Sequence, residues 1–415
     1  MRVPGSKSLT NRTLLVAALA DGNTHLTKAL LSDDSRYFAQ ALQQLGFDVS
    51  LDPARLEMTV TGLGGRIPSR QAELFIGNAG TAARFLTAFL SLGNGEYILD
   101  GDVRMRERPI GDLVAALERL GATIANPQSS VFNLQSICPP IKITASGLPG
   151  GRADVAGNVS SQFLSALLMV APYAQNSVEL HVTDGLNSKP YVDMTLAVMS
   201  DFGVDITRDG YEYFVIHSAR YQPRETYAIE SDASAASYFF AAPALLGGKV
   251  RVENISCRSK QGDIAFLDVL QQMGCAVNIG ADYIEVTGPA SLRGVDVDMR
   301  DISDTAQTLA AIAPFASSPT RIRGVDFIRA KETDRIAATC AELTRLGVDV
   351  QEHLDGLTIQ PCASIRPATV QTYNDHRMAM AFALIGLRAP GVSIENPTCV
   401  SKTFPNYFKV LETLG

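Results

Sequence analysis

The segment Leu45-Gly46-Phe47-Asp48-Val49-Ser50-Leu51 joins the end of a helix to the start of a strand. Glycine after a large apolar residue suits the C′ position of a helix, where a left-handed backbone costs glycine little. The residues that follow alternate between apolar and polar side chains, which is typical of a half-buried strand. The segment therefore predicts an amphipathic helix that ends near Leu45 and a strand directly after it.

The same apolar-glycine pair recurs along the whole chain. The six copies are Leu45-Gly46, Leu120-Gly121, Phe202-Gly203, Met273-Gly274, Leu346-Gly347 and Leu414-Gly415. Their glycines are 75, 82, 71, 73 and 68 residues apart, a period too long for a solenoid. Because single cores stop growing at roughly 250–300 residues, a chain of 415 residues predicts two domains. We expect six similar units, three in each domain.

A second helix in each unit opens on a short polar motif. The six motifs start at Ser6, Asn78, Ser160, Ser231, Asp301 and Asn374. Helices such as 163–171 and 378–387 are apolar on nearly all sides, so we expect them to be buried. A helix N-terminus offers unpaired N–H groups and roughly half a positive charge, which favours anion binding. Ordinary N-capping is the alternative reason for these polar residues.

These patterns indicate an α/β fold in which sheets of mixed strand direction surround buried helices. The stretch 223–229 breaks the pattern after a strand at 213–216. We therefore expect a first domain of residues 7–229 and a second domain of residues 1–6 and 230–415.

The charge of the chain limits its partners. The formal charge is −7 at pH 7, whereas nucleic-acid binders cluster Lys and Arg to neutralise phosphates. The chain opens on no signal peptide, and no apolar run reaches about 18 residues. We expect a cytosolic protein without nucleic-acid or membrane partners, and the spacing of His, Cys and carboxylates indicates no metal site.

Several short windows combine Lys or Arg with Gly, Ser, Asn or carboxylates, namely 7–12, 78–84, 104–109, 331–335, 376–377 and 402–403. Such cations suit phosphate and carboxylate ligands. Lys331 and Arg335 are four residues apart, so we expect them to share one helix face. Asp304 and Glu332 lie among these cations and are candidates for general acid or base. A helix cap at Asp304 and a structural role for His376 are the alternatives.

Together these windows resemble the 5-enolpyruvylshikimate-3-phosphate synthase family over essentially the whole chain. The motifs that carry the resemblance are Pro4-Gly5-Ser6-Lys7-Ser8, Gly77-Asn78-Ala79-Gly80-Thr81, Arg104-Met105, Glu107-Arg108-Pro109, Ser160-Ser161-Gln162, Lys331-Glu332-Thr333-Asp334-Arg335, Asp375-His376-Arg377 and Lys402-Thr403-Phe404-Pro405. The resemblance implies transfer of the enolpyruvyl group of phosphoenolpyruvate to the 5-hydroxyl of shikimate 3-phosphate, with release of phosphate. It also implies two domains of three βαβαββ-like units that close over the substrates. We expect a monomer without a cofactor.

The resemblance also implies roles for individual residues. Those on the shikimate 3-phosphate side are Lys7, Ser8, Arg12, Ser160, Ser161, Gln162, Ser188, Tyr191, Asp304 and Lys331. Those on the phosphoenolpyruvate side are Lys7, Asn78, Gly80, Arg108, Gln162, Arg335, His376, Arg377 and Lys402. Asp304 resembles the base at the attacking hydroxyl, Glu332 resembles the acid that protonates the methylene carbon, and Lys7 belongs to the catalytic set.

The chain departs from the family pattern at two aromatic residues and at its start. Phe327 stands where the family usually has an Asn that contacts the shikimate phosphate, and Phe85 follows Arg84 where many members have Pro. Of the N-terminal stretch that supplies a strand in the family only Met1 to Pro4 remain, and the sixth unit stops at Leu414-Gly415 without its strand pair. We therefore expect a missing or unpaired edge strand in the second domain.

Three other functions remain as alternatives. A related transferase acts on UDP-N-acetylglucosamine and carries a reactive Cys in one loop. The corresponding loop of this chain, residues 104–111, contains no Cys. An RNA 3′-phosphate cyclase shares a related repeat fold, and the acidic balance counts against it. The third is a truncated, weakly active or inactive homologue that still binds shikimate 3-phosphate.

Overall fold

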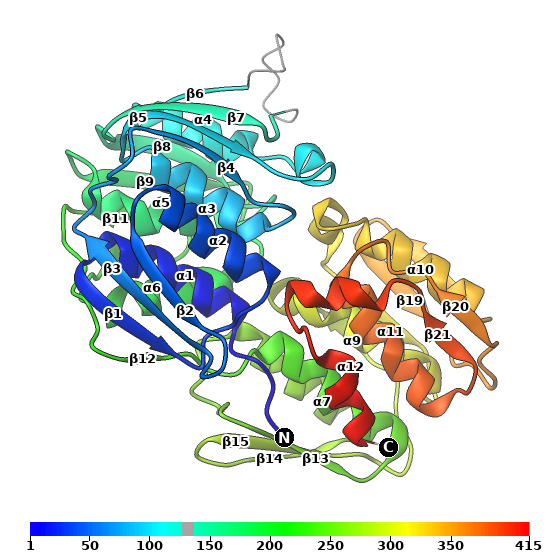
Figure 1. Cartoon of the computed structure of the whole chain (residues 1–415). Coiled ribbons are helices and arrows are strands. Elements are labelled where there is room, and N and C mark those ends of the chain that lie inside the picture. The colour runs from blue at the N-terminus through cyan, green and yellow to red at the C-terminus, as the bar shows by residue number, and fades with distance from the viewer. Residues whose placement is uncertain (127–136, 415) are drawn as a thin grey trace. The chain divides into compact units, whose positions relative to one another are not determined.

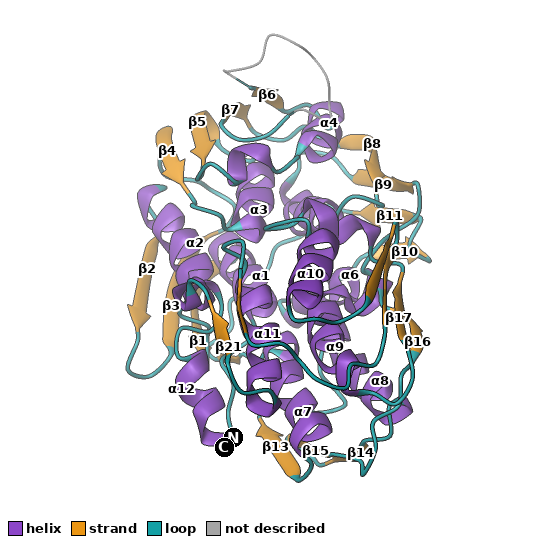
Figure 2. Ribbon diagram, turned by 90° about the vertical axis from the view of Figure 1, so that its right-hand side faces the viewer, coloured by secondary structure: helices purple, strands orange, loops and turns teal. Residues whose placement is uncertain are grey.

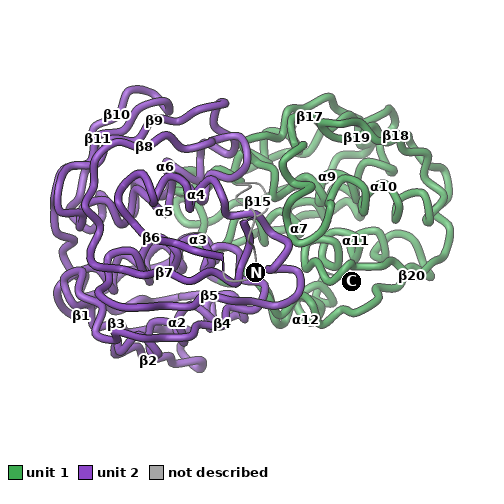
Figure 3. Tube along the Cα trace, turned by 90° about the horizontal axis from the view of Figure 1, so that it is seen from above, with its two compact units in different colours: residues 1–4, 230–415 green, residues 5–229 purple. Residues whose placement is uncertain are grey.

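The computed structural model describes residues 1–126 and 137–414. The chain forms two compact units, residues 5–229 and residues 1–4 with 230–415 (Figure 3). The larger unit begins at Gly5, two residues before the expected Lys7. Ser6 caps the first helix of that unit, and Gly5 packs so closely on the backbone of Lys28 that a Cβ atom would overlap it. Both residues therefore belong to the larger unit.

The larger unit contains three sheets and their helices. Its helices are α1 (Lys7–Leu19), α2 (Asp33–Gln44), α3 (Gly80–Leu90), α4 (Gly111–Arg119), α5 (Ser161–Val170) and α6 (Lys189–Asp201). Its strands are β1 (Asp21–Thr27), β2 (Asp48–Asp52), β3 (Glu57–Leu63), β4 (Gln71–Phe75), β5 (Asn94–Asp100), β6 (Thr123–Ala125), β7 (Ile141–Ser146), β8 (Gly151–Ala156), β9 (Val178–Thr183), β10 (Thr207–Asp209), β11 (Tyr213–Ile216) and β12 (Tyr227–Ala228). Figure 1 shows the sheets on the outside of this unit, with α1, α3 and α5 between them.

Each of these sheets has the same topology. The strand orders are β12-β1-β3-β2, β4-β5-β7-β6 and β8-β9-β11-β10. The first two strands of each sheet are parallel, and the other two pair in antiparallel fashion. The short strand β12 takes the place in the first sheet that β4 and β8 take in theirs. The expected βαβαββ unit is therefore confirmed in this part of the chain.

The smaller unit repeats the pattern less completely. Its helices are α7 (Ala233–Leu246), α8 (Phe266–Gln272), α9 (Ala306–Ile312), α10 (Arg335–Arg345), α11 (His376–Arg388) and α12 (Tyr407–Leu411). Its strands are β13 (Lys249–Glu253), β14 (Ala276–Ile279), β15 (Tyr283–Thr287), β16 (Asp296–Asp298), β17 (Thr320–Arg323), β18 (Val350–His353), β19 (Gly356–Ile359), β20 (Ala368–Val370) and β21 (Val392–Ile394). The sheet β16-β17-β19-β18 has the full topology, whereas β13-β15-β14 has three strands and β20-β21 has two among the described residues.

The N-terminal residues lie beside β13. The amino group of Met1 donates to the carbonyl of Arg251 at 2.7 Å, and the backbone N–H of Glu253 donates to the carbonyl of Met1 at 2.9 Å. Met1 thus bonds along β13 where a complete sheet has its first strand. The prediction that the second domain has a missing or unpaired edge strand stays a prediction.

The helix pattern of the sequence is confirmed in detail. Helix α5 and the part of α11 up to Ile385 are buried almost throughout, as their apolar composition predicted. Figure 2 shows α11 with α7 and α9 beside it. The glycines after α2, α4, α6, α8 and α10 all have positive φ, between +83° and +107°. Gly415, the sixth member of that series, lies outside the described residues. None of the helices in the described ranges is long and apolar enough to cross a membrane.

Short 3₁₀ turns complete the units and carry several of the residues discussed below. They are η1 (Met105–Glu107), η3 (Ala171–Tyr173), η4 (Gly262–Ala265), η5 (Arg300–Thr305), η6 (Ala313–Phe315), η7 (Asp326–Ala330), η8 (Pro397–Lys402) and η9 (Glu412–Leu414).

Candidate active site

Lys7 begins α1, and a buried carboxylate faces it. The side chain of Ser6 accepts a hydrogen bond from the backbone of Leu9 and so caps the helix. The Nζ atom of Lys7 lies 3.6 Å from Oδ2 of Asp34 in the first turn of α2, and these side chains are only 13% and 3% exposed. Asp34 was not predicted from the sequence, because an acidic residue in the first turn of a helix is common for the helix dipole alone.

Arg12 lies one helical turn after Ser8 and is buried. Its guanidinium donates to the hydroxyls of Thr195 at 2.7 Å and Ser165 at 3.3 Å, and to the carbonyls of Tyr191 at 3.0 Å and Ser8 at 3.1 Å. Burial lowers the pKa of Arg12 to about 10, so the group is still charged at neutral pH. The aromatic ring of Phe85, in α3, has its centroid 5.4 Å from the guanidinium carbon.

The starts of α3 and α5 are joined by side chains. The Oγ atom of Ser160 accepts from the backbone of Gln162, whose side-chain amide donates to Thr81 at 3.2 Å.

Arg108, after η1, donates to the side-chain oxygen of Asn78 at 2.9 Å and to its carbonyl at 3.3 Å. A Cβ atom on Gly80 would overlap the Arg108 guanidinium. The lack of a side chain at Gly80 therefore lets Arg108 lie over the start of α3.

The remaining predicted residues of the larger unit lie near the starts of α5 and α6. Ser161 is the first residue of α5 and is buried. Ser188 precedes α6 with a left-handed backbone at φ 56°, and Tyr191 lies in the first turn of that helix. The carbonyl of Tyr191 connects this group to Arg12.

The smaller unit gathers its predicted residues around the buried Arg335. This guanidinium bonds Asp375 at 2.8 and 3.2 Å, Glu332 at 2.8 Å and Asp304 at 3.3 Å. Burial by itself would lower the pKa of Arg335, but the nearby carboxylates of Asp375 and Glu332 outweigh burial and raise it. Arg335 is therefore a permanent cation held by three carboxylates.

Two further cations complete this cluster. Lys402 donates to Glu332 Oε1 at 2.9 Å. Arg377 donates to the carboxylate of Asp304 at 2.6 Å and to the carbonyl of the same residue at 3.1 Å. The formal charges of Asp304, Glu332 and Asp375 thus balance those of Arg335, Arg377 and Lys402. An anionic ligand that binds these cations would share them with their carboxylate partners.

The structure corrects two expectations about helices. Lys331 and Arg335 do not share a helix face, because α10 begins at Arg335 and Asp334 caps it through the backbone N–H groups of Ile336 and Ala337. The Nζ atom of Lys331 lies 5.9 Å from the ring centroid of Phe327. Asp304 does not cap a helix either, because it lies in η5 and its carboxylate bonds two arginines. The alternative of a simple cap at Asp304 is therefore wrong.

His376 is buried at the start of α11, with Nδ1 3.5 Å from Asp375. Asp375 caps this helix by accepting from the backbone of Arg377 at 2.8 Å. Tyr373 and Asn374, the two residues before Asp375, both have positive φ, a backbone conformation that is uncommon outside glycine.

The buried Glu342 of α10 fixes the segment before Asp375. Its carboxylate accepts from the backbone of Gln371 at 3.0 Å and from the hydroxyl of Tyr373 at 2.8 Å. Burial, together with the hydrogen bond to Glu342, raises the pKa of Tyr373 to about 12, so the hydroxyl stays a donor. Neither the role of Asp375 nor that of Glu342 was predicted from the sequence.

Replacing Asp375 with Asn is expected to lower the free energy of unfolding by about 3–5 kcal/mol, because it leaves part of the Arg335 charge buried without its partner. Urea denaturation measures this loss. The matched control is Asp296→Asn, which removes a pair with Arg323 whose side chains are 64% and 45% exposed. The control should cost less than about 1 kcal/mol. Equal losses in the two variants would contradict the structural role of Asp375.

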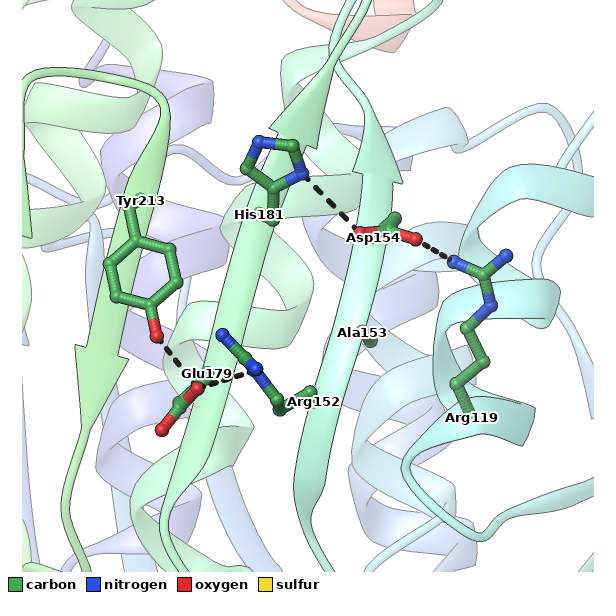
Figure 4. A pocket seen from close by; sticks show the side chains of 7 residues that line it. All are labelled: Arg119, Arg152, Ala153, Asp154, Glu179, His181 and Tyr213. Carbon is green, nitrogen blue, oxygen red and sulfur yellow. Dashed lines mark hydrogen bonds and ion pairs between the residues drawn. The ribbon is translucent and has the colours of Figure 1, made fainter.

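A hollow of about 580 Å³ lies elsewhere, on the outer face of β8, β9 and β11 (Figure 4). Its charged side chains pair with one another: Arg119 with Asp154 at 2.6 Å and Arg152 with Glu179 at 2.7 Å, while Tyr213 also donates to Glu179. None of the predicted site residues lines it. Because these paired side chains are exposed and none of them belongs to the predicted site, we place the chemistry at the buried clusters instead.

Among residues 1–126 and 137–414, no group of three His, Cys, Asp or Glu side chains is arranged to hold a metal ion.

Comparisons with known proteins agree with one another. The sequence pattern of one family, described as EPSP synthase (3-phosphoshikimate 1-carboxyvinyltransferase), matches residues 1–411. A protein of Nostoc sp. named 3-phosphoshikimate 1-carboxyvinyltransferase is 54% identical over 98% of this chain and 94% of the relative. One of the same name from Sulfurovum sp. is 47% identical over 100% of this chain and 96% of the relative.

Two solved structures have a similar fold. An EPSP synthase from Acinetobacter baumannii has a TM-score of 0.82 at 24% identity and covers 100% of this chain and 95% of that one. The enolpyruvyl transferase NikO from Streptomyces tendae has a TM-score of 0.79 at 20% identity, with 100% and 94% covered. At these identities the two structures bear on the fold alone.

Proposed function

This chain belongs to the EPSP synthase family, and from that premise we propose roles for the residues of its two units. The enzyme transfers the enolpyruvyl group of phosphoenolpyruvate to the 5-hydroxyl of shikimate 3-phosphate and releases phosphate. This reaction is a step toward chorismate and the aromatic amino acids. The comparisons give no support to the UDP-N-acetylglucosamine transferase, the RNA cyclase or the inactive homologue.

The larger unit supplies most of the shikimate 3-phosphate contacts in this proposal. They are Lys7, Ser8, Arg12, Ser160, Ser161, Gln162, Ser188 and Tyr191, with Asp304 and Lys331 from the other unit. The bonds of Arg12 support this role, because they all go to neutral acceptors and leave its charge available for an anion. Phe327, whose ring centroid lies 5.9 Å from Nζ of Lys331, stands where the family usually has an Asn, so the positive charge of Lys331 would bind the phosphate without that contact.

The other cations are assigned to phosphoenolpyruvate, which shares Lys7 and Gln162 with shikimate 3-phosphate. Lys7, Asn78, Gly80, Arg108 and Gln162 contribute from the larger unit, and Arg335, His376, Arg377 and Lys402 from the smaller one. Guanidinium groups bind carboxylate and phosphate oxygens in pairs, which suits a small ligand with both groups. The close approach of Arg108 to Gly80 supports a site for such a ligand at the start of α3.

Asp304 acts as the base in this proposal. Its carboxylate is held by Arg335 and Arg377, which fix its position. The ionised carboxylate takes the proton of the 5-hydroxyl as that oxygen bonds to C2 of phosphoenolpyruvate. An arginine pair that also holds the ligand would bring base and ligand together.

Glu332 acts as the acid. It donates a proton to the methylene carbon, so that C2 becomes electrophilic and accepts the hydroxyl oxygen. A tetrahedral intermediate forms. The Glu332 carboxylate then takes a methyl proton back as phosphate departs with the proton held by Asp304, and the double bond is restored. Because Glu332 bonds Lys402 and Arg335, it must be released from a cation before it can carry a proton. The anionic ligand, which competes for the same cations, supplies that release.

The observation that carries the proposal is the cluster of three carboxylates and three cations in the smaller unit. No purely structural reason requires six charged groups to be paired in this way, since buried ion pairs add little net stability. The proposal also includes a monomeric, cytosolic enzyme without a cofactor. Detection of the enolpyruvyl ether by ³¹P NMR after mixing both substrates with the protein tests it.

Replacing Gly80 with Ala tests the phosphoenolpyruvate site. The new Cβ would overlap the Arg108 guanidinium and push it from Asn78, so the KM for phosphoenolpyruvate should rise about tenfold, as expected for one weakened charged hydrogen bond. The KM for shikimate 3-phosphate should change less than about threefold, since its proposed contacts stay intact. Steady-state kinetics with each substrate varied measures both constants. A rise confined to shikimate 3-phosphate would contradict the assignment.

A further inference from the structure

Four helices of the larger unit meet at one guanidinium. Arg12 extends from α1, Thr195 and Tyr191 belong to α6, Ser165 belongs to α5, and Phe85 belongs to α3. Arg12 is 1% exposed. Its bonds use four of its five N–H donors, and the rings of Phe85 and Tyr191 lie 5.4 and 5.9 Å from its guanidinium carbon.

The partners of Arg12 differ in charge from those of the other deeply buried arginine. Arg335 is 2% exposed and bonds three carboxylates, whereas every bonded partner of Arg12 among the described residues is a hydroxyl or a backbone carbonyl. Buried cations are ordinarily paired with carboxylates, because an uncompensated charge is costly to remove from water. The neutral surroundings of Arg12 therefore need a reason.

We propose that Thr195 and Ser165 are positioning residues that orient the Arg12 guanidinium through neutral hydroxyls and so reserve its charge for shikimate 3-phosphate. This inference rests on the proposed function. It adds that the absence of a carboxylate partner at this point is itself required for substrate affinity.

The geometry fits this role. Thr195 accepts from Nε of Arg12 and lies 2.9 Å from Ser165 and 2.8 Å from the carbonyl of Tyr191, so its own hydroxyl hydrogen also has an acceptor. Ser165 accepts from Nη2. The two hydroxyls together hold both the Nε and the Nη2 edge of the guanidinium plane, which fixes its direction. Hydroxyl groups do this without supplying the negative charge that a carboxylate would add.

A pair of near-isosteric variants separates charge from shape. Ser165→Asp places a carboxylate next to the guanidinium, whereas Ser165→Asn has almost the same volume and stays neutral. We expect Ser165→Asp to weaken shikimate 3-phosphate binding at least about tenfold more than Ser165→Asn does, because the new carboxylate competes with the substrate for Arg12. Calorimetric titration of each folded variant with shikimate 3-phosphate measures this ratio. Equal affinities of the two variants would overturn the proposal.

A second pair of variants, at Thr195, tests whether a hydroxyl orients the Arg12 guanidinium. This pair still tests the proposal if Ser165→Asp does not fold. Thr195→Val removes the hydroxyl with little change of shape, and Thr195→Ser keeps it. Thr195→Val should raise the KM for shikimate 3-phosphate about tenfold with kcat changed less than about threefold, and Thr195→Ser should restore the KM to within about twofold. A purely structural role would instead lower the melting temperature and leave the KM unchanged, which would overturn the proposal.

Arg12→Gln distinguishes failure of this inference from failure of the proposed function. If Arg12→Gln binds shikimate 3-phosphate as tightly as the unaltered protein, the assignment of Arg12 is wrong and the inference falls with it. If Arg12→Gln binds weakly but the Asp and Asn variants of Ser165 bind equally, only the inference is wrong. Weak binding by Arg12→Gln and by Ser165→Asp, with near-normal binding by Ser165→Asn, supports both.

Discussion

Replacing Glu332 with Gln should lower kcat by about 10²- to 10⁴-fold, the range expected for loss of a general acid. Glutamine keeps the shape of the side chain and can accept a hydrogen bond from Lys402, but it has no proton to give the methylene carbon. The reaction then lacks the step that makes C2 electrophilic. Both KM values should change much less than kcat, because the cations that hold the substrates remain. Steady-state kinetics measures each constant.

The matched control for this change is Glu395→Gln. Glu395 belongs to the same unit but is exposed and follows β21, outside the charged cluster. Its replacement should leave kcat within about twofold, as for most surface substitutions. If Glu332→Gln also retains kcat within a few-fold, Glu332 is not the acid.

Lys7→Met should lower kcat/KM by about 10³-fold, because one cation is proposed to contact both anionic substrates and each charged bond contributes about 1.5–3 kcal/mol. Methionine keeps most of the volume of the stem, so the loss reflects the charge. The change should raise the KM for each substrate, unlike Gly80→Ala. It also leaves Asp34 buried without the amine that lies 3.6 Å away, which adds repulsion toward anions.

Lys142→Met serves as the control for Lys7. Lys142 lies in β7, and its ion pair with Glu96 has side chains 40% and 53% exposed. Both KM values of this variant should stay within about twofold of those of the unaltered enzyme. An unchanged KM for both substrates in Lys7→Met would remove Lys7 from the site.

The repeat was readable from the sequence because its signals are local. A glycine that ends a helix needs a left-handed backbone whatever surrounds it, so the pairs at Leu45-Gly46 and Leu346-Gly347 predicted helix ends that the structure has. The closing of the first sheet by β12 was not predicted. That pairing joins Leu26 to Tyr227, and no local pattern reports a contact between residues so far apart.

The site was predicted from motifs. The wrong or missing predictions concern side chains that could bond either to neighbours in the sequence or to distant residues. Lys331 and Arg335 have helical spacing, but Asp334 caps α10 and the helix starts after Lys331. Asp is a common helix cap, yet the carboxylate of Asp304 accepts hydrogen bonds from arginines of α10 and α11. Asp34 and Glu342 were missed because their partners, Lys7 and Tyr373, are distant in sequence.

The most direct test of the function is steady-state release of phosphate from phosphoenolpyruvate with different acceptors. With shikimate 3-phosphate the protein should release phosphate in step with formation of the enolpyruvyl ether. With UDP-N-acetylglucosamine, or without an acceptor, release should be at background. Tight binding of shikimate 3-phosphate without any phosphate release, or release only with UDP-N-acetylglucosamine, would contradict the account.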